Sequence, residues 1–344
     1  MGSKYLGRAV NVTLAQPGAP ADAPSIFAVS GQDYVSQTKT ADPFTFNQPL
    51  QGLGGGGLGP VASKWGRAFS GLHVRFKAEK NTLLTPNTLE LNIYNLAAAT
   101  RKQLQSYGMF VELSAGYQAD LPTLPIAFRG TTRTIDHIRQ GADWVTRIRS
   151  GDGEHGYRFG QANQTWPQGV LSSTIAIYLA NQVKAADPLH IDVSAFIAAA
   201  PSLNYPVQAY ANGYVAYGNA IDQLSLLIGF GYELSIQNGS LVAISTSGFT
   251  QSTGGIPLIS PSTGLLGSPD HGDPNLAGLP SVLKVNCLMN ARIQPGDLVQ
   301  VVSSDTNGTF RVQKITHTGD LDGNDWQSEI EAYALGQTPG VAPL

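Results

Sequence analysis

"IDHIRQGADWVTRIR", residues 135–149, and "ITHTGDLDGNDWQSEIEAY", residues 315–333, carry the same pattern twice in one chain. Both stretches run Ile, one residue, His, a Gly-containing turn, Asp-Trp, one residue, Thr or Ser, one residue, Ile. Gly and Asn favour tight turns, and alternating apolar and polar residues are typical of a strand with one buried face. Each stretch is therefore predicted to form a β-hairpin, and the two hairpins are predicted to be alike.

The shared residues keep the same phase in both copies. Alternate side chains of a strand lie on one face, and a slip of one residue would exchange the two faces. Taken singly, such residues are ordinary, because a strand Trp usually belongs to the core and a strand His is usually hydrogen-bonded rather than a ligand. The joint match of spacing and order exceeds this. The repeat signature comprises His137, Trp144, Thr146, Ile148, His317, Trp326, Ser328 and Ile330.

The opposite face of the two hairpins differs in charge. The first copy carries Arg147 and Arg149 there, and the second carries Glu329 and Glu331. These four residues are candidate contacts between the two units, with exposed pairs contributing only about 0–1 kcal/mol each. Two unrelated solvated faces would look the same, and that alternative stays open.

The match extends upstream, to "GMFVELSAGY" and "PGDLVQVVSS". Two copies are too few for a solenoid, which needs about three repeats or more. They suit two similar small barrels instead. The predicted fold class is mainly β with an α+β unit, in which two similar small β-barrels are joined by a central α+β domain.

The residues between the strand signals set the predicted boundaries. Pro and Gly interrupt regular structure, and they crowd "QPGAPADAP" and "QGLGGGGLGP". In the middle of the chain, Ile175, Leu179 and Val183 recur at helical spacing, and Asn238-Gly239 predicts a hairpin turn. The expected parts are a first strand of barrel 1 (1–15), a Gly/Pro-rich insertion (16–63), barrel 1 (64–155), the central α+β domain (156–250), a linker (251–280), barrel 2 (281–335) and a tail (336–344).

Composition excludes several classes of function. Charged residues make up 13% of the chain, the formal net charge is −3, and Lys and Arg are scattered, so no nucleic-acid footprint is expected. Cys287 is the only cysteine, which excludes an intrachain disulfide and predicts a buried apolar residue. No stretch approaches the length of a membrane span, and no secretory signal is seen, so no membrane anchor is expected.

No constellation of catalytic or metal-binding residues emerges. HExxH, GxSxG and CxxC motifs are absent from the sequence. "GDGEHG" (151–156) and "DLDGNDW" (320–326) gather acidic residues, but both are explained by turns. A calcium loop would need Gly at its sixth position, where Asp325 stands. We therefore expect no catalytic, cofactor-binding or metal-binding residues, no cofactor, and no enzymatic activity.

Three stretches together resemble the baseplate or tail hub proteins of contractile-tailed bacteriophages: "FSGLHVRFKAEKNTLLTPNTLELNIYNLAAATRKQL", "VELSAGY…FRGTTRTIDHIRQGADWVTRIRSGDGE" and "IQPGDLVQVVSS…NGTFRVQKITHTGD…GNDWQSEIEAY". The resemblance covers roughly half of the chain. It implies a homotrimer whose duplicated barrels form a pseudo-sixfold ring, adapting the sixfold tail tube to a threefold central spike. It also implies a place in the virion baseplate after synthesis in the host cytoplasm.

The chain departs from the family pattern in two respects. The insertion 16–63 is longer than expected, and we expect it to reach other baseplate proteins. No spike β-helix or lysozyme-like domain follows the second barrel, so cell-wall cutting would belong to another polypeptide. Two alternatives stay open. A tail-associated cell-wall hydrolase would show activity abolished by one carboxylate substitution. A carbohydrate-binding adhesin would bind glycans, through a cluster such as Tyr205, Tyr210, Tyr214 and Tyr217.

Overall fold

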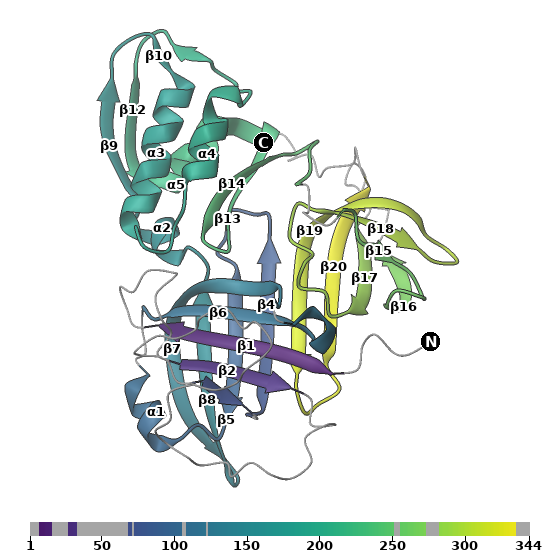
Figure 1. The fold of residues 1–344 in the computed structure, drawn as a ribbon. Helices are drawn as coiled ribbons and strands as arrows, with labels where there is room; N and C mark the ends of the chain where they lie inside the picture. Colours follow the sequence, from purple (N-terminus) through teal and green to yellow (C-terminus); the bar gives the residue numbers. More distant parts are fainter. Residues whose placement is uncertain are drawn as a thin grey trace.

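The computed structural model describes residues 7–15, 27–32, 68–70, 72–104, 108–121, 123–250, 255–272 and 282–334. The chain is mainly β with a few helices, and most of its strands belong to one large, almost entirely antiparallel sheet (Figure 1). The expected tail 336–344 lies outside these residues, as does most of the expected insertion 16–63.

The first half of the sheet comes from the N-terminal part of the chain. Its strands lie in the order β4-β5-β8-β7-β6-β1-β2-β3. Their bounds are β1 Arg8–Ala15, β2 Phe27–Gln32, β3 Ala68–Ser70, β4 Val74–Asn81, β5 Thr88–Tyr94, β6 Phe110–Tyr117, β7 Ile126–Gln140 and β8 Asp143–Gly151. We call these strands unit 1. The short helix α1, Ala98–Gln103, and a 3-10 turn, Gln118–Asp120, lie on its connections.

The second half comes from the C-terminal part of the chain. Its strands lie in the order β16-β17-β20-β19, with β18 on the first half of β19 and β15 beside β18. Their bounds are β15 Leu258–Ile259, β16 Leu265–His271, β17 Leu283–Leu288, β18 Leu298–Val302, β19 Asn307–Asp320 and β20 Trp326–Ala334. We call these strands unit 2. Strands β19 and β4 pair and make the two units one sheet.

Strand amphipathicity decides which face of this sheet is buried. In β4, Val74, Phe76 and Ala78 are buried, whereas Arg75 and Lys77 are exposed. This is the alternation expected where one face covers a core and the other meets water. One apolar cluster lies under unit 1 and a second lies under unit 2. Cys287 belongs to the second cluster, and its burial raises the pKa of the thiol to about 12.

A separate α+β unit, the central unit, occupies the upper part of Figure 1 and has its own apolar core. Helix α3 buries Ile175, Leu179 and Val183, as its helical spacing predicts. Its helices are α2 Glu154–Phe159, α3 Ser172–Ala186, α4 Ser194–Ala199 and α5 Ala220–Ile228, with 3-10 turns at Ala200–Ser202 and Gly229–Gly231. Its strands are β9 Gln161–Trp166, β10 Val170–Leu171, β11 Ala209–Tyr210, β12 Tyr214–Asn219, β13 Tyr232–Gln237 and β14 Ser240–Ser245.

The observed strand pairing tests two expectations from the sequence. The Asn-Gly hairpin is confirmed, since β13 and β14 pair across Asn238 and Gly239, both of which have positive φ. The mainly β class with an α+β part is also confirmed. The described strands of units 1 and 2 form one continuous open sheet, however, and their pairing closes no barrel. The units do not close into barrels because β4, at the edge of unit 1, pairs with β19 of unit 2 and so joins the two units.

Candidate functional site: the duplicated hairpins and their seam

The two hairpins have the same register. In β7–β8, Ile135 lies opposite Ile148 and His137 opposite Thr146. In β19–β20, Ile315 lies opposite Ile330 and His317 opposite Ser328. The register shifts at the same place in both, between 132 and 134 in the first hairpin and between 312 and 314 in the second. A β-bulge fixes where a hairpin bends, so the two copies repeat a shape as well as a sequence.

The duplication extends to the neighbouring strand. Leu91 of β5 lies opposite Ile148, and Val285 of β17 lies opposite Ile330. The chain then continues alike in both units: the backbone N–H of Asn95 donates to Trp144 O at 2.7 Å, and that of Met289 donates to Trp326 O at 3.2 Å. The β5-β8-β7-β6 group therefore corresponds to β17-β20-β19-β18.

The two His residues of the signature hold the hairpins together. His137 Nδ1 hydrogen-bonds Thr146 Oγ1 at 3.0 Å, and His317 Nδ1 hydrogen-bonds Ser328 Oγ at 2.8 Å. Burial lowers the pKa of both rings, and it lowers that of His317 to about 3, with a further lowering from the positive charge of Lys80. A ring kept neutral and hydrogen-bonded across a strand pair has a structural role.

The two Trp residues have different surroundings. Trp326 is 4% exposed, and its ring meets Phe76 of β4 edge to face at 5.9 Å between centroids. Trp144 is 37% exposed, with the Arg101 guanidinium 4.3 Å from its ring centroid. The second hairpin lies against unit 1 of its own chain, which covers Trp326. Its counterpart in the first hairpin has no such strand beside it among the described residues.

The seam between β4 and β19 is closely packed. Gly319 lies opposite Phe76, and a Cβ on Gly319 would overlap the Phe76 ring and come within 2.9 Å of Trp326 Cζ3. Glycine is therefore required at this point of the seam. Neighbouring positions carry Thr316 opposite Glu79 and Thr318 opposite Lys77.

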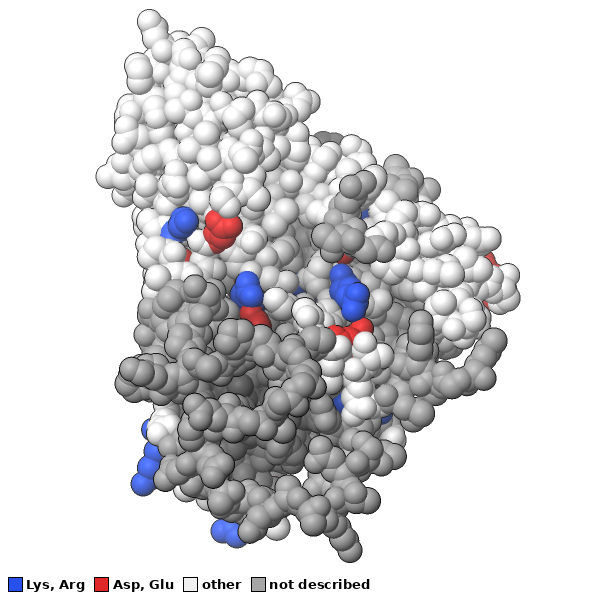
Figure 2. Space-filling view, in the orientation of Figure 1, with Lys and Arg blue, Asp and Glu red and all other residues white. Residues whose placement is uncertain are grey.

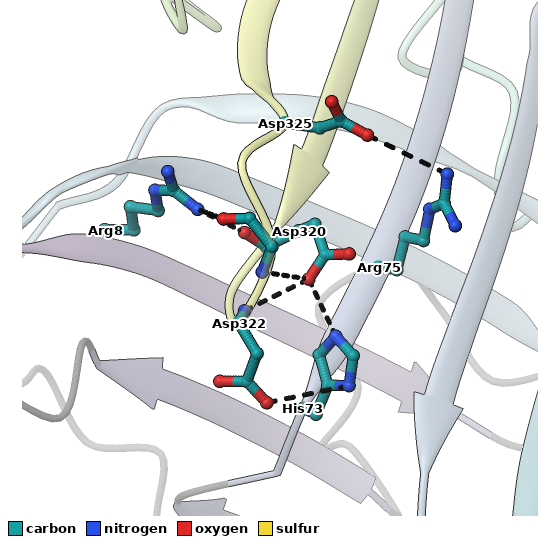
Figure 3. Close-up of polar contacts among 7 residues, drawn as sticks. Arg8, His73, Arg75, Asp320, Asp322 and Asp325 are labelled. Atoms are coloured by element: carbon teal, nitrogen blue, oxygen red, sulfur yellow. Dashed lines mark hydrogen bonds and ion pairs between the residues drawn. The ribbon is translucent and has the colours of Figure 1, made fainter.

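The turn between β19 and β20 is tied to unit 1 by a polar cluster, shown in Figure 3. Asp320 Oδ1 accepts the backbone N–H groups of Asp322 at 3.0 Å and Gly323 at 2.8 Å, and it lies 2.7 Å from His73 Nε2. Arg8 of β1 donates to the backbone oxygen of Asp320 at 2.6 Å. Burial acts to raise the pKa of Asp320, but these hydrogen bonds outweigh burial and lower it overall. The acidic "DLDGNDW" stretch thus closes its own turn.

A second polar cluster lies where units 1 and 2 meet the central unit. Lys80 of β4 is fully buried and donates from Nζ to Asn238 Oδ1 at 2.9 Å and to Gln294 Oε1. Burial lowers the pKa of Lys80 to about 8, against the raising effect of Asp152 and Asp297. Three segments distant in sequence therefore share one buried cation.

Asp152 belongs to the same polar cluster. Its carboxylate accepts the backbone N–H groups of Asn238 at 2.6 Å and Gly239 at 2.8 Å. Burial raises the pKa of Asp152 to about 6, although Lys80 and these hydrogen bonds act to lower it. Glu154, its neighbour in "GDGEHG", pairs with Arg133 and, at 3.1 Å, with Arg158. These acidic side chains are occupied by structural contacts.

The charged residues proposed as contacts between units lie apart within one chain. Arg147 on β8 faces Glu90 of β5 at 3.7 Å, and Glu331 on β20 faces Lys314 at 3.8 Å. Strands β5, β4 and β19 separate β8 from β20 in the sheet. Arg149 and Glu329 are exposed. A contact of these residues between chains stays a prediction.

The polar cluster around Lys80 was not predicted from the sequence, although a signal for it was present. Val74, Phe76, Ala78 and Lys80 occupy the inward-facing phase of one strand. A Lys in an apolar phase indicates a buried, hydrogen-bonded cation. Its partners come from residues 238 and 294, which no local pattern connects to β4. In the part of the chain that the structure describes, no cluster of three or more His, Cys, Asp and Glu could hold a metal ion.

The fold is similar to those of solved tail proteins. One is the tail protein from Neisseria meningitidis MC58, with a TM-score of 0.55, 11% identity, and coverage of 78% of this chain and 97% of that chain. Another is the 43 kDa tail protein of prophage MuSo2 from Shewanella oneidensis, with a TM-score of 0.51, 9% identity, and coverage of 78% and 99%. These two likenesses show that the chain shares the fold of solved tail proteins over most of its length.

A further similar structure is an E. coli component of the type VI secretion system, itself described as similar to the T4 bacteriophage tail proteins gp27 and gp5. Its TM-score is 0.49, with 12% identity and coverage of 80% of this chain and 77% of that chain. No protein-family model matches the sequence, and no curated protein matches it. Among the described residues, no helix is both long and apolar enough to cross a membrane.

Proposed function

We propose that this chain is the structural hub of a phage tail baseplate. Three copies form a ring in which the two units of each chain take quasi-equivalent places, so that six similar units surround one axis. Such a ring adapts a sixfold tail tube to a threefold central spike. The observation that carries the proposal is the shared register of the two hairpins, bulge included, in a fold similar to those of tail proteins.

The duplication supports this function for a geometric reason. A ring of three identical chains has threefold symmetry, and it presents six similar surfaces only if each chain supplies two. The side chains at which the two units agree are those that fix hairpin shape, such as the His137–Thr146 and His317–Ser328 pairs.

The surface of the central unit also supports an assembled state. Figure 2 shows charged side chains thinly scattered over the visible face, with the upper, central unit almost free of them. Large apolar side chains are exposed on that unit, among them Val215 at 63%, Tyr217 at 76%, Leu226 at 73% and Phe230 at 81%. Contiguous exposed apolar patches mark surfaces that partners cover, and we propose that these side chains belong to such a surface. Tail tube, spike and other baseplate proteins are the proposed partners, the last through residues 16–63.

The molar mass in solution tests the proposal. Native mass spectrometry of the purified chain, alone and mixed with its tail tube and spike proteins, should give a species of three chains. A chain that stays monomeric in every mixture would contradict the hub. A cell-wall hydrolase would instead release peptidoglycan fragments, and an adhesin would bind glycans as a monomer. We expect no hydrolysis, because Asp152, Glu154 and Asp320 are held by structural contacts.

A further inference from the structure

Lys80 and Asn238 meet in the buried polar cluster where the central unit lies against β4. Lys80 Nζ donates to Asn238 Oδ1 at 2.9 Å, although the two residues are 158 positions apart in the chain. An amine that is hydrogen-bonded to a carboxamide oxygen also lies close to the carboxamide carbon, which is one bond further on. The folded chain therefore holds a nucleophile beside an electrophile, an arrangement that accelerates reactions within one molecule.

The amine of Lys80 is suited to act as a nucleophile. Only a neutral lysine amine has a free lone pair, and removing the amine from water favours the neutral form. Lys80 is fully buried, and burial lowers its pKa from 10.5 to about 8. Three other titratable groups interact with it. Asp152 and Asp297 act through their negative charges, and His317, with a pKa of about 3, stays neutral.

Asp152 is a carboxyl group that can carry a proton for the amine. Of the two carboxyl groups whose charge acts on Lys80, Asp152 acts more strongly. Burial raises the pKa of Asp152 from 3.8 to about 6. The pKa values of the amine and the carboxyl group are thus brought close together, so a proton can pass from Lys80 to Asp152 far more readily than between the same groups in water.

The turn that carries Asn238 is fixed in position. The backbone N–H groups of Asn238 and Gly239 donate to the Asp152 carboxylate at 2.6 and 2.8 Å, and Asn238 itself has a φ of 51°. Its backbone is therefore held from the side of Asp152 while its side chain meets Lys80. This leaves the carboxamide little freedom to turn away from the amine.

Lys80 also contacts a second carboxamide, that of Gln294. The Nε2 atom of Gln294 is firmly held, because it donates to Ala291 O at 2.8 Å. The Nδ2 atom of Asn238 makes a longer hydrogen bond, of 3.4 Å, to Gln294 Oε1. A nitrogen that is weakly held departs more easily, so Asn238 is the better reaction partner of the two.

We propose that Lys80 and Asn238 react after folding to form an isopeptide bond between unit 1 and the central unit. The Nζ lone pair of neutral Lys80 forms a bond to Asn238 Cγ, and the Cγ–Nδ2 bond breaks. Nδ2 leaves as ammonia, with one proton that Nζ gives up and Asp152 carries. Nothing is oxidised or reduced, and Asp152 ends as it began. This inference goes beyond the proposed hub and does not depend on it, because every group belongs to one chain.

The bond makes the contact between the central unit and the sheet permanent. It also closes a loop from residue 80 to residue 238 in the unfolded chain, and closing a long loop stabilises the folded state by lowering the conformational entropy of the unfolded one. The reaction is slow compared with folding, so the freshly refolded chain has the free Lys80 described above. Unfolding experiments on Lys80 itself use that unlinked chain.

An Asn-Gly pair has a competing reaction, in which the glycine nitrogen attacks the Asn side chain and forms a succinimide with loss of ammonia. Here the N–H of Gly239 donates to Asp152 Oδ1 at 2.8 Å, which disfavours that attack. Both products are lighter by one ammonia, so the mass of the chain alone does not separate them. Lys80→Met does, because it abolishes the isopeptide bond and leaves succinimide formation possible.

The full-length chain, isolated in denaturant and refolded at pH 7, tests the proposal. Its mass should fall by one ammonia with time, and tandem mass spectrometry of a proteolytic digest should identify a branched peptide that joins Lys80 to Asn238. Lys80→Met and Asn238→Gly should both abolish this peptide, and glycine suits the positive φ at residue 238. Lys77→Met is the matched control, because Lys77 is exposed on the other face of β4, and it should link like the original chain. Circular dichroism checks that each variant folds.

The pH dependence of the linkage rate tests the part of Asp152. The reactive form has one proton shared by Lys80 and Asp152, so the rate should be highest between about pH 6 and about pH 8 and fall on both sides. Asp152→Asn should slow the reaction at pH 7 by about tenfold or more and remove the fall at high pH. A rate lowered equally at every pH would overturn the proton-carrying part and leave Asp152 only a positioning residue.

Three results would overturn the isopeptide bond or its position. An original chain that refolds and yields no branched peptide at any pH would overturn the bond. A loss of ammonia that persists in Lys80→Met would assign that loss to a succinimide. A branched peptide that joins Lys80 to Gln294 would overturn the choice of Asn238. We expect the Lys80–Asn238 peptide in the original chain and in Lys77→Met, and in neither blocking variant.

Discussion

At the scale of single residues, Gly319 and Lys80 show opposite ways of holding the junction together. Gly319 is needed because of the space it leaves empty, since a side chain there would overlap Phe76 and Trp326. Lys80 is needed because of the hydrogen bonds it makes, although its charge is buried. Each residue therefore predicts a different response to substitution.

Gly319→Ala should destabilise the protein by about 1–3 kcal/mol, the usual effect of inserting a methyl group into a packed site. Chemical denaturation followed by circular dichroism measures the free energy of unfolding. Gly231→Ala is the control, because nothing lies within 4 Å of the added Cβ and no positive φ is involved. That control should change stability by less than about 0.5 kcal/mol. Equal effects of the two variants would contradict a tight seam.

Lys80 should give the unfolding free energy a distinctive pH dependence. The pKa of Lys80 is lowered to about 8 in the folded chain from 10.5, so between these values the unfolded chain binds more protons. Stability conferred through this group then rises with pH across the window, by up to about 1 kcal/mol per pH unit. Lys80→Met should remove this rise when denaturation curves of the two proteins are compared at pH 7.5, 9 and 10. Parallel curves would contradict the shift.

At the scale of elements, the β19–β20 turn is held by its connections to unit 1 (Figure 3). Asp320 contacts His73, next to β4, and also accepts two backbone N–H groups of the turn itself. Asp322 lies 3.6 Å from His73 Nδ1, but its side chain is 69% exposed. Two acidic residues two positions apart should therefore contribute very unequally.

Asp320→Ala should destabilise the protein by about 1–3 kcal/mol, because it removes a charged acceptor from the His73 ring and from two backbone N–H groups. Asp322→Ala should cost about 0–1 kcal/mol, as exposed ion pairs usually do. Urea unfolding at pH 7 measures both. If Asp322→Ala proved the more damaging variant, the turn would depend on surface charge rather than on the closed hydrogen-bond set.

The elements differ in how far the sequence could predict them. The two hairpins, the helix α3 and the Asn238-Gly239 turn follow from local periodicity and turn chemistry, and the structure has each of them. The pairing of β4 with β19 could not be read in this way. It joins residues more than 200 positions apart through backbone groups that every residue possesses. The same non-local choice of partners explains why the expected barrels are one open sheet.

At the scale of the whole molecule, the exposed apolar side chains of the central unit predict a contact surface. Phe230 is 81% exposed, so Phe230→Ser should leave the free energy of unfolding within about 0.5 kcal/mol of its original value. The same substitution should weaken association with the tail tube or spike protein at least several-fold in co-sedimentation. Leu83→Ser, at a 52% exposed site on unit 1, is the comparison. Unchanged association of the Phe230 variant would place the partner surface elsewhere.

The seam inside the chain has a consequence for dilution. Because β4 and β19 belong to one polypeptide, their pairing has a fixed effective concentration, whereas contacts between chains of the proposed ring weaken as the protein is diluted. In a closed ring of whole chains, every second junction is then permanent and the others are reversible. Units 1 and 2 of one chain can therefore leave such a ring only together, so the ring always contains an even number of units.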